Sequence, residues 1–475
     1  MNEVITKRSR TLIFTVLMIC SITGALLQTA LTTALPAIME DLKISASDAQ
    51  WLTGAYSLAM GVMVPVTPFL LKRFKTKPLF LSGMGMYFIG LLFSATAGVF
   101  PALLLGRIIQ AFGNGLLLSM TQVVILTIFP PEKRGTAMGI YGLAVGAAPV
   151  LAPTITGMVI DVFDWHVIFW FALSIVALNI LFAAFVMKNV LENKKLPFDT
   201  LSAVFSAVGF TGLLLGIGNL GTDRFFSVTI GLPLLAGIIM LVLFVLRQLR
   251  LNSPFLEIRT FKNREFRLSV IVSMLLYAVM MGGSTLMPIY IQIVHGLSAT
   301  MSGLIMLPGS LAMAIISPFA GKIYDKFGIR LLAFTGSLLM ALSCLANAFV
   351  SAETSVIYLA LVYIPRLIAI SCIMMPIVTW GMSTLDSKYT SHGTALLTSL
   401  RTISGAIGSA VFVAVMAYAT RITSGSASVT ANETGINASF MGITVVAVIQ
   451  LVIVFLFVEK KPKPREIGLD ASESC

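Results

Sequence analysis

Fourteen apolar runs, each of about 20 residues, divide this 475-residue sequence and constrain its fold more than any other feature. A membrane-spanning helix needs about 20 apolar residues to cross a hydrocarbon core of roughly 30 Å. Backbone groups in lipid have no water to bond, so such segments must be helical. The predicted spans are 11–35, 50–71, 78–97, 101–124, 135–160, 166–187, 200–219, 229–249, 267–290, 300–321, 330–350, 355–378, 391–418 and 438–458.

Composition supports an all-α polytopic membrane protein and argues against a soluble enzyme. The chain is 57% hydrophobic and 11% charged, whereas soluble domains are about 25% charged. The first apolar run is too long for a cleavable signal peptide and is predicted to be a signal anchor. The four Cys residues form no disulfide framework.

The distribution of basic residues predicts the topology. Of the 32 Lys and Arg residues, 26 lie at the termini or in alternate loops on one side, and Lys43, Arg224 and Arg421 lie on the other. The positive-inside rule then places both termini in the cytoplasm. A net charge of +12 does not indicate nucleic-acid binding here, because the basic residues sit in short loops. The stretch 420–437 is expected to be a flexible external loop, and 459–475 a cytoplasmic tail.

Two pairs of sequence segments resemble one another, and the members of each pair lie about 250 residues apart. PFLLKRFKTK (68–77) corresponds to SPFAGKIYDKFGIR (317–330), and LLLGRIIQ (103–110) corresponds to VYIPRLIA (362–369). The repeat pairs spans 1–6 with spans 9–14, an architecture typical of transporters that work by alternating access. The predicted domains are a six-helix bundle at 1–187, a linker with two extra helices (200–219 and 229–249) at 188–266, a second bundle at 267–458 and the tail.

Apart from Arg247, Arg267 and Arg330, which lie within three residues of a span end, the only charged residues inside the spans are Arg107, Arg366 and Arg401, and no span contains Asp or Glu. A charge in the hydrocarbon costs roughly 2.5–3.5 kcal/mol on insertion scales and usually marks a ligand or ion pathway. Buried cations alone disfavour a simple cation/proton exchanger. They favour a protein that handles anionic, zwitterionic or neutral amphiphiles, since guanidinium groups bind carboxylate and phosphate.

Arg107, Gln110 and Asn114 are spaced at i, i+3 and i+7 and therefore share one helix face. We expect this face to line a substrate cavity. The alternative is a buried structural network in which Arg107 pairs with carbonyl groups or with Gln28. For Arg366 and Arg401, cavity exposure competes with snorkelling to the membrane surface or a polar contact between helices.

At these residues the chain resembles the major facilitator superfamily, and within it the fourteen-helix drug:proton antiporter family and its lincomycin-resistance-type exporters of Gram-positive bacteria. The resemblance is carried by LLLGRIIQAFGNG in span 4, GLAVGAAPVLAPTITG in span 5, the loop GKIYDKFGIR, MPIYIQIVHGLSATMSGLIMLPG over spans 9–10, and SHGTALLTSLRTISGAIGSA in span 13. It covers nearly the whole chain.

The resemblance implies roles for further residues. Asp325, with Lys326 and Arg330, would form a latch at the cytoplasmic gate, pairing with basic residues or capping a helix N-terminus; the alternative is a solvated loop acid. In the other half, Lys72 replaces the family's Asp, so the latch would be one-sided. The segment in span 5 resembles the family's antiporter motif, whose glycines and prolines would favour export. The alternative is that these residues only permit close helix packing. They are Gly142, Gly146, Pro149, Pro153 and Gly157.

In span 1, Gln28 stands where many family members carry an Asp, so no membrane-embedded acid remains to carry a proton. The remaining titratable candidates for coupling are Asp161, Asp164, Asp325 and His392. The histidines do not cluster with Cys or carboxylates at metal-ligand spacing, so no metal is predicted. No phosphate-binding loop is present, so neither ATP nor another cofactor is expected.

These observations predict a secondary active multidrug efflux transporter in the bacterial cell membrane, a monomer that exports amphipathic drugs in exchange for protons. A first alternative is an exporter of an anionic physiological amphiphile, such as a bile salt, fatty acid or cyclic dinucleotide, bound by the intramembrane arginines. A second is a lipid-handling or sensory membrane protein on the same fold.

Overall fold

The computed structural model describes residues 6–160, 162–191, 193, 199–218, 227–251, 254, 256–297, 299–423 and 428–458. Every regular element in these ranges is helical, which confirms the predicted fold class. The α-helices are α1 (Lys7–Leu42), α2 (Ala46–Arg73), α3 (Thr76–Ala95), α4 (Phe100–Ile128), α5 (Arg134–Ile160), α6 (His166–Val186), α7 (Thr200–Gly218), α8 (Val228–Arg250), α9 (Arg264–Ile289), α10 (Ala299–Phe327), α11 (Ile329–Ala346), α12 (Val356–Ser383), α13 (Thr390–Ile422) and α14 (Ser428–Phe457).

Within the described residues, thirteen of these helices are long and apolar enough to cross a membrane. The protein is therefore a multi-pass membrane protein. The fifth predicted span coincides with α5, which is not among the thirteen. The total of fourteen spans and the cytoplasmic position of the termini stay predictions.

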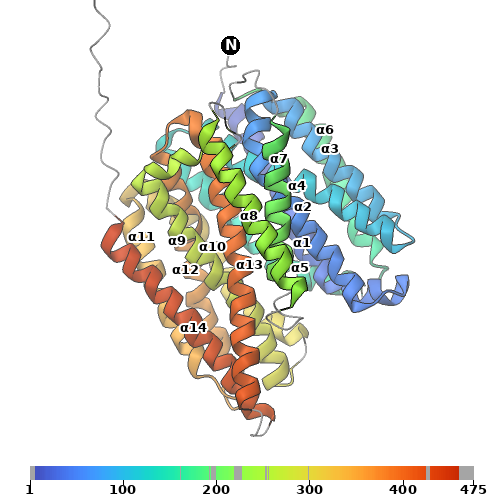
Figure 1. The fold of residues 1–475 in the computed structure, drawn as a ribbon, viewed down its shortest axis with the longest axis vertical. Coiled ribbons are helices and arrows are strands. Elements are labelled where there is room, and N and C mark those ends of the chain that lie inside the picture. The colour runs from blue at the N-terminus through green and yellow to red at the C-terminus, as the bar shows by residue number, and fades with distance from the viewer. Residues whose placement is uncertain are drawn as a thin grey trace, which may run out of the picture.

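The helices pack as two bundles with a helical hairpin between them (Figure 1). Helices α1–α6 contact one another in the first half, and α9–α14 do so in the second. The halves meet where α5 lies along α10 and α12 and where α13 lies along α2 and α4. By the sequence repeat, α5 corresponds to α13 and α2 to α10, so the two main contacts between the halves are equivalent.

The inserted hairpin α7–α8 contacts both halves, because α7 packs against α2 of the first half and α13 of the second. Its two helices approach closely at glycines, and at one end Arg247 forms a bidentate ion pair with Asp199 at 2.8 Å. The hydrogen bonds from Arg247 lower the pKa of Asp199 to about 2, so the pair persists at every physiological pH. Gln248 donates to the hydroxyl of Ser202 at 2.6 Å and extends this polar contact.

The prediction of a flexible loop over 420–437 is wrong for most of that stretch. Helix α13 continues to Ile422 and α14 begins at Ser428. Residues 424–427 lie outside the described part of the chain, as does the predicted tail at 459–475. Helix forms here despite the Ser/Thr/Gly-rich composition because Ala431 and Ile436 are buried and Asn437 donates to the Val350 carbonyl at 2.9 Å.

Close packing of the hairpin gives a stability prediction. A Cβ atom at Gly237 would lie 2.4 Å from the backbone nitrogen of Leu213, whereas one at Gly231 would meet nothing within 4 Å. We expect Gly237→Ala to destabilise the protein by about 1–3 kcal/mol, the typical cost of overpacking. Gly231→Ala on the same helix should be neutral or stabilising, since Ala is the better helix former. Thermal unfolding in detergent measures both; equal midpoints for the two variants would contradict the packing argument.

Candidate functional site

The two halves touch most closely where α5 begins and α10 ends. Phe14 of α1 packs against Phe129, just before α5, so this contact lies at the end of the bundle where α1 begins. We call this end the inner end, because the charge pattern predicts it to be cytoplasmic. A Cβ atom at Gly321 of α10 would lie 2.3 Å from the carbonyl oxygen of Gly135, and one at Gly139 would lie 2.7 Å from that of Ser317. Only glycine permits this backbone approach.

Asp325 links the two halves at the inner end. Its carboxylate, at the end of α10, accepts hydrogen bonds from the backbone N–H groups of Gly135 and Thr136, both at 2.8 Å, and from the Thr136 hydroxyl at 2.6 Å. These N–H groups belong to the first turn of α5, where no intrahelical acceptor exists. A carboxylate there also interacts favourably with the helix dipole. Asp325, in the second half, therefore caps the N-terminus of α5, in the first half.

The basic neighbours of Asp325 do not pair with it among the described residues. Lys326 lies over the ring of Phe327, with Nζ 5.2 Å from the ring centroid. Arg330 lies in the first turn of α11. Of the two latch geometries expected from the sequence, the structure therefore contains the helix cap and not the charge pair.

Two glycines of the antiporter motif, Gly142 and Gly146, face the opposite half. A Cβ atom at Gly142 would lie 2.6 Å from Cγ of Met375, and one at Gly146 would lie 2.0 Å from Cε of Met313. Both methionines belong to the second half, and Ser317 adds a hydrogen bond to the Gly139 carbonyl at 2.9 Å. Pro149, Pro153 and Gly157 lie farther along α5, and their surroundings are outside the described part of the structure.

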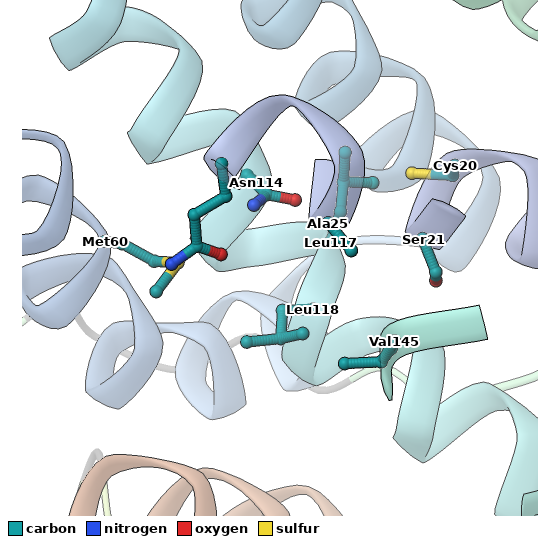
Figure 2. A pocket seen from close by; sticks show the side chains of 9 residues that line it. Cys20, Ser21, Ala25, Met60, Asn114, Leu117, Leu118 and Val145 are labelled. Carbon is teal, nitrogen blue, oxygen red and sulfur yellow. The ribbon is translucent and has the colours of Figure 1, made fainter. Parts of the chain in front are cut away.

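A small pocket of about 40 Å³ opens inside the first half (Figure 2). Gln28 and Asn114, two of the residues predicted to line a substrate cavity, line this small pocket, and their role in substrate binding stays a prediction. This volume is room for a few water molecules only. The wall is otherwise apolar or weakly polar: Cys20, Ser21, Ala25, Met60, Leu117, Leu118 and Val145.

Arg107 does not line this pocket, but the ring of Tyr56 connects it to Asn114, which does. Its guanidinium carbon is 4.1 Å from the centroid of the Tyr56 ring, and Asn114 donates to the Tyr56 hydroxyl at 2.7 Å. Arg107 also donates to Gln110 at 2.8 Å, and Gln110 in turn donates to Ser94 at 2.9 Å. The predicted shared face of α4 is thus one continuous polar network. Arg107 itself is only 1% exposed, and its Nε faces the Leu52 carbonyl at 3.5 Å rather than Gln28.

Arg366 occupies the equivalent place in the second half and is also 1% exposed. It donates to the Val279 carbonyl at 2.8 Å, and its guanidinium carbon is 6.0 Å from the centroid of the Tyr363 ring. Gly283 makes room for it, since a Cβ there would lie 1.6 Å from Nη2. The charge is therefore held inside its own half.

Arg401 is placed differently. It lies on α13, the helix that packs against α2 and α4 of the first half. Its guanidinium carbon is 4.8 Å from the centroid of the Tyr277 ring, and Tyr141 of α5 lies within electrostatic range. Its Nε and Nη1 atoms are buried without a hydrogen-bond partner among the described residues. Exposure of the three arginines to a transport cavity in another conformation stays a prediction.

Of the remaining candidates for proton coupling, the structure describes His392, in the second half, and Asp164, in the first. His392, at the start of α13, is buried and its Nδ1 accepts a hydrogen bond from the Glu257 backbone at 3.3 Å. Asp164 accepts hydrogen bonds from the backbone and ring of His166. Asp161 lies outside the described residues. Their roles in coupling stay predictions.

Sequence reasoning missed the aromatic partners of the three arginines. Tyr363 could have been found, because it precedes Arg366 by three residues and shares its helix face. Tyr56 and Tyr277 come from other helices, α2 and α9, and no local pattern pairs them with Arg107 or Arg401.

Comparison with known proteins is consistent with this architecture. Residues 17–409 match the family model described as the Major Facilitator Superfamily. The chain is 36% identical to the uncharacterized MFS-type transporter YcnB of Bacillus subtilis over 455 residues, covering 96% of each protein. It is 36% identical over 403 residues to the lincomycin resistance protein LmrB of the same organism, covering 84% of each.

A solved structure shares the fold. The human organic anion transporter MFSD10 superposes with a TM-score of 0.69 at 15% identity, covering 94% of this chain and 99% of that one. At this identity the likeness concerns the arrangement of helices alone.

The cap at Asp325 gives a conformational prediction. We expect Asp325→Asn to weaken closure of the inner end by about 2 kcal/mol, since hydrogen bonds to a charged group are worth roughly 1.5–3 kcal/mol. Spin labels at Lys133→Cys and Lys388→Cys, on opposite halves with the native cysteines replaced, report the separation. The distance distribution should shift to longer values in the Asn variant. Glu132→Gln, an exposed neighbour, should leave it unchanged; identical distributions for all three proteins would rule out the latch.

Proposed function

Because the chain belongs to the major facilitator superfamily, we propose that it is a proton-driven exporter of small amphipathic molecules that works by alternating access. The membership rests on the family match over residues 17–409 and on relatives of 36% identity across most of the chain. Transporters of this superfamily move small molecules and are not enzymes. The drug class is inferred from the name of the lincomycin-resistance relative and applies to this chain as part of the proposal.

The observation that carries the alternating-access mechanism is the Asp325 cap. At the inner end, the contact between the two halves is made by a few polar bonds and by close glycine contacts. Such a contact can break as a unit when the halves rock. The equivalence of the α5–α10 and α2–α13 contacts supports rocking about an axis between the halves.

One proton per cycle is sufficient for this export. A charge moving inward across 100 mV releases about 2.3 kcal/mol. Since about 1.4 kcal/mol corresponds to a tenfold concentration ratio, this sustains roughly a 40-fold gradient of a neutral solute. A higher stoichiometry is therefore not required.

We propose that the pocket between Gln28 and Asn114 is part of the substrate path. Its mixture of an amide pair and flexible apolar side chains suits amphipathic solutes of varied shape. At about 40 Å³ it is too small for a drug in the conformation described. It would enlarge when α1, α4 and α5 separate from the second half.

Transport in proteoliposomes tests the proposal. With an acidic lumen, we expect uptake of lincomycin above the passive level of protein-free liposomes, and release of the gradient by a protonophore should abolish the difference. An imposed membrane potential at equal pH distinguishes the two driving forces. Uptake that is indifferent to both gradients would contradict proton-driven export.

The pocket gives a matched pair of variants. Leu118 lines it, whereas Leu105 on the same helix is 48% exposed and faces away from the core. We expect Leu118→Trp to fill the pocket and reduce lincomycin transport at least tenfold, while Leu105→Trp stays within about twofold of the wild type. Expression and thermal unfolding of the two variants control for folding. Full transport by a folded Leu118→Trp protein would remove the pocket from the path.

A further inference from the structure

The surroundings of the three buried arginines differ in one respect that bears on ligand binding. Arg107 and Arg366 each face a backbone carbonyl oxygen within their own half, and each has one buried nitrogen without a partner. Arg401 has two such nitrogens, Nε and Nη1, although it is only 3% exposed. Of the three guanidinium groups, Arg401 is the least satisfied by the surrounding protein.

No carboxylate neutralises Arg401 among the residues that the structure describes. Helix α13 contains no Asp or Glu at all. Burial of a cation without a counter-ion is strongly unfavourable. The face of the Tyr277 ring, with its centroid 4.8 Å from the guanidinium carbon, offsets only part of this cost.

Further unpaired polar groups lie on the same helix. Thr398 precedes Arg401 by three residues and so shares its helix face. The hydroxyls of Thr398 and Ser399 are both buried without a partner among the described residues. Of the two, Thr398 is the one on the face of Arg401, and a cation with a neighbouring hydroxyl donor forms a donor set that can bind an oxyanion.

The position of Arg401 would make this donor set accessible if the two halves rock apart during a transport cycle. Helix α13 packs on α2 and α4 of the first half, and Tyr141 of α5 lies within electrostatic range of the guanidinium. The group therefore lies at the contact between the halves, where a rocking motion opens and closes space. Arg107 and Arg366 point into the interior of one half each.

We propose that Arg401, with Thr398 and Tyr277, forms a subsite between the two halves for the carboxylate or phosphate of an anionic amphiphile. The proposal rests on the proposed export function and names the substrate class that this site selects. The bound oxyanion neutralises Arg401 as the halves close around it, so closure is less costly with the ligand than without it.

A probe pair that differs only in charge tests the subsite. Dansyl-phenylalanine carries a carboxylate, and dansyl-phenylalaninamide is its uncharged counterpart. Binding of each to the purified full-length protein in nanodiscs is measured by dansyl fluorescence. We expect the wild type to bind the carboxylate at least tenfold more tightly than the amide, and Arg401→Gln to reduce this preference to less than twofold while leaving amide binding unchanged.

Two further variants keep the test decisive. Thr398→Val preserves shape and removes one donor, and should reduce the preference about fivefold. Arg421→Gln, at the exposed outer end of the same helix, should retain the wild-type preference. The proposal is overturned if the wild type shows no preference, if Arg401→Gln or Thr398→Val keeps it in full, or if Arg401→Gln weakens both probes equally.

The same probes separate this proposal from the export function. Gradient-driven uptake of the amide into proteoliposomes reports export without reference to the subsite. Carboxylate-selective binding that depends on Arg401, without any gradient-driven transport, would sustain the subsite and refute the exporter. Transport of both probes with equal efficiency in wild type and Arg401→Gln would refute the subsite alone.

Discussion

The inner end of this molecule depends on one carboxylate that completes a helix belonging to the other half. The first N–H groups of α5 have no intrahelical acceptor, and between packed helices water cannot easily serve. Asp325 supplies the acceptor from the end of α10. The close glycine contacts bring the two helices near enough for this bond to form, and a side chain at Gly135 or Gly321 would prevent it. The cap at Asp325 can therefore form only where the two helices approach at glycines.

The internal repeat allows the start of α13 to be compared with the start of α5. Gly393 and Thr394 at the start of α13 repeat the Gly135-Thr136 pair at the start of α5. Thr394, however, donates toward the sulfur of Met382 at 3.5 Å, a weak acceptor within its own half. The sequence carries Lys72 where the first half would need a carboxylate. The sulfur contact of Thr394 thus differs from the carboxylate cap that Thr136 meets.

Much of the fold could be predicted from the sequence, because the membrane reduces the problem to counting apolar segments and basic loops. The helix cap at Asp325 was anticipated as one of two geometries, since the loop motif fixes where the carboxylate lies but not which partner it meets. Less could be predicted at 428–437. Its polar composition indicates a loop, yet burial of Ala431 and Ile436 against the second half stabilises a helix there. Tertiary packing outweighs local propensity at that point.

The three arginines show why a charge in a membrane span does not by itself define a binding site. Arg107 and Arg366 are placed by the repeat at equivalent positions, and each is held by a carbonyl group and a tyrosine inside its own bundle. Arg107 still influences the pocket, because Tyr56 connects its guanidinium to Asn114. Loss of Arg107 would therefore alter the pocket wall through the orientation of Tyr56, without direct contact with a solute. Arg401 has no counterpart in the first half, where the apolar helix α5 occupies the equivalent place. An unmatched charge at the contact between otherwise equivalent halves is better explained by a ligand than by the fold, since the fold forms its other half without one.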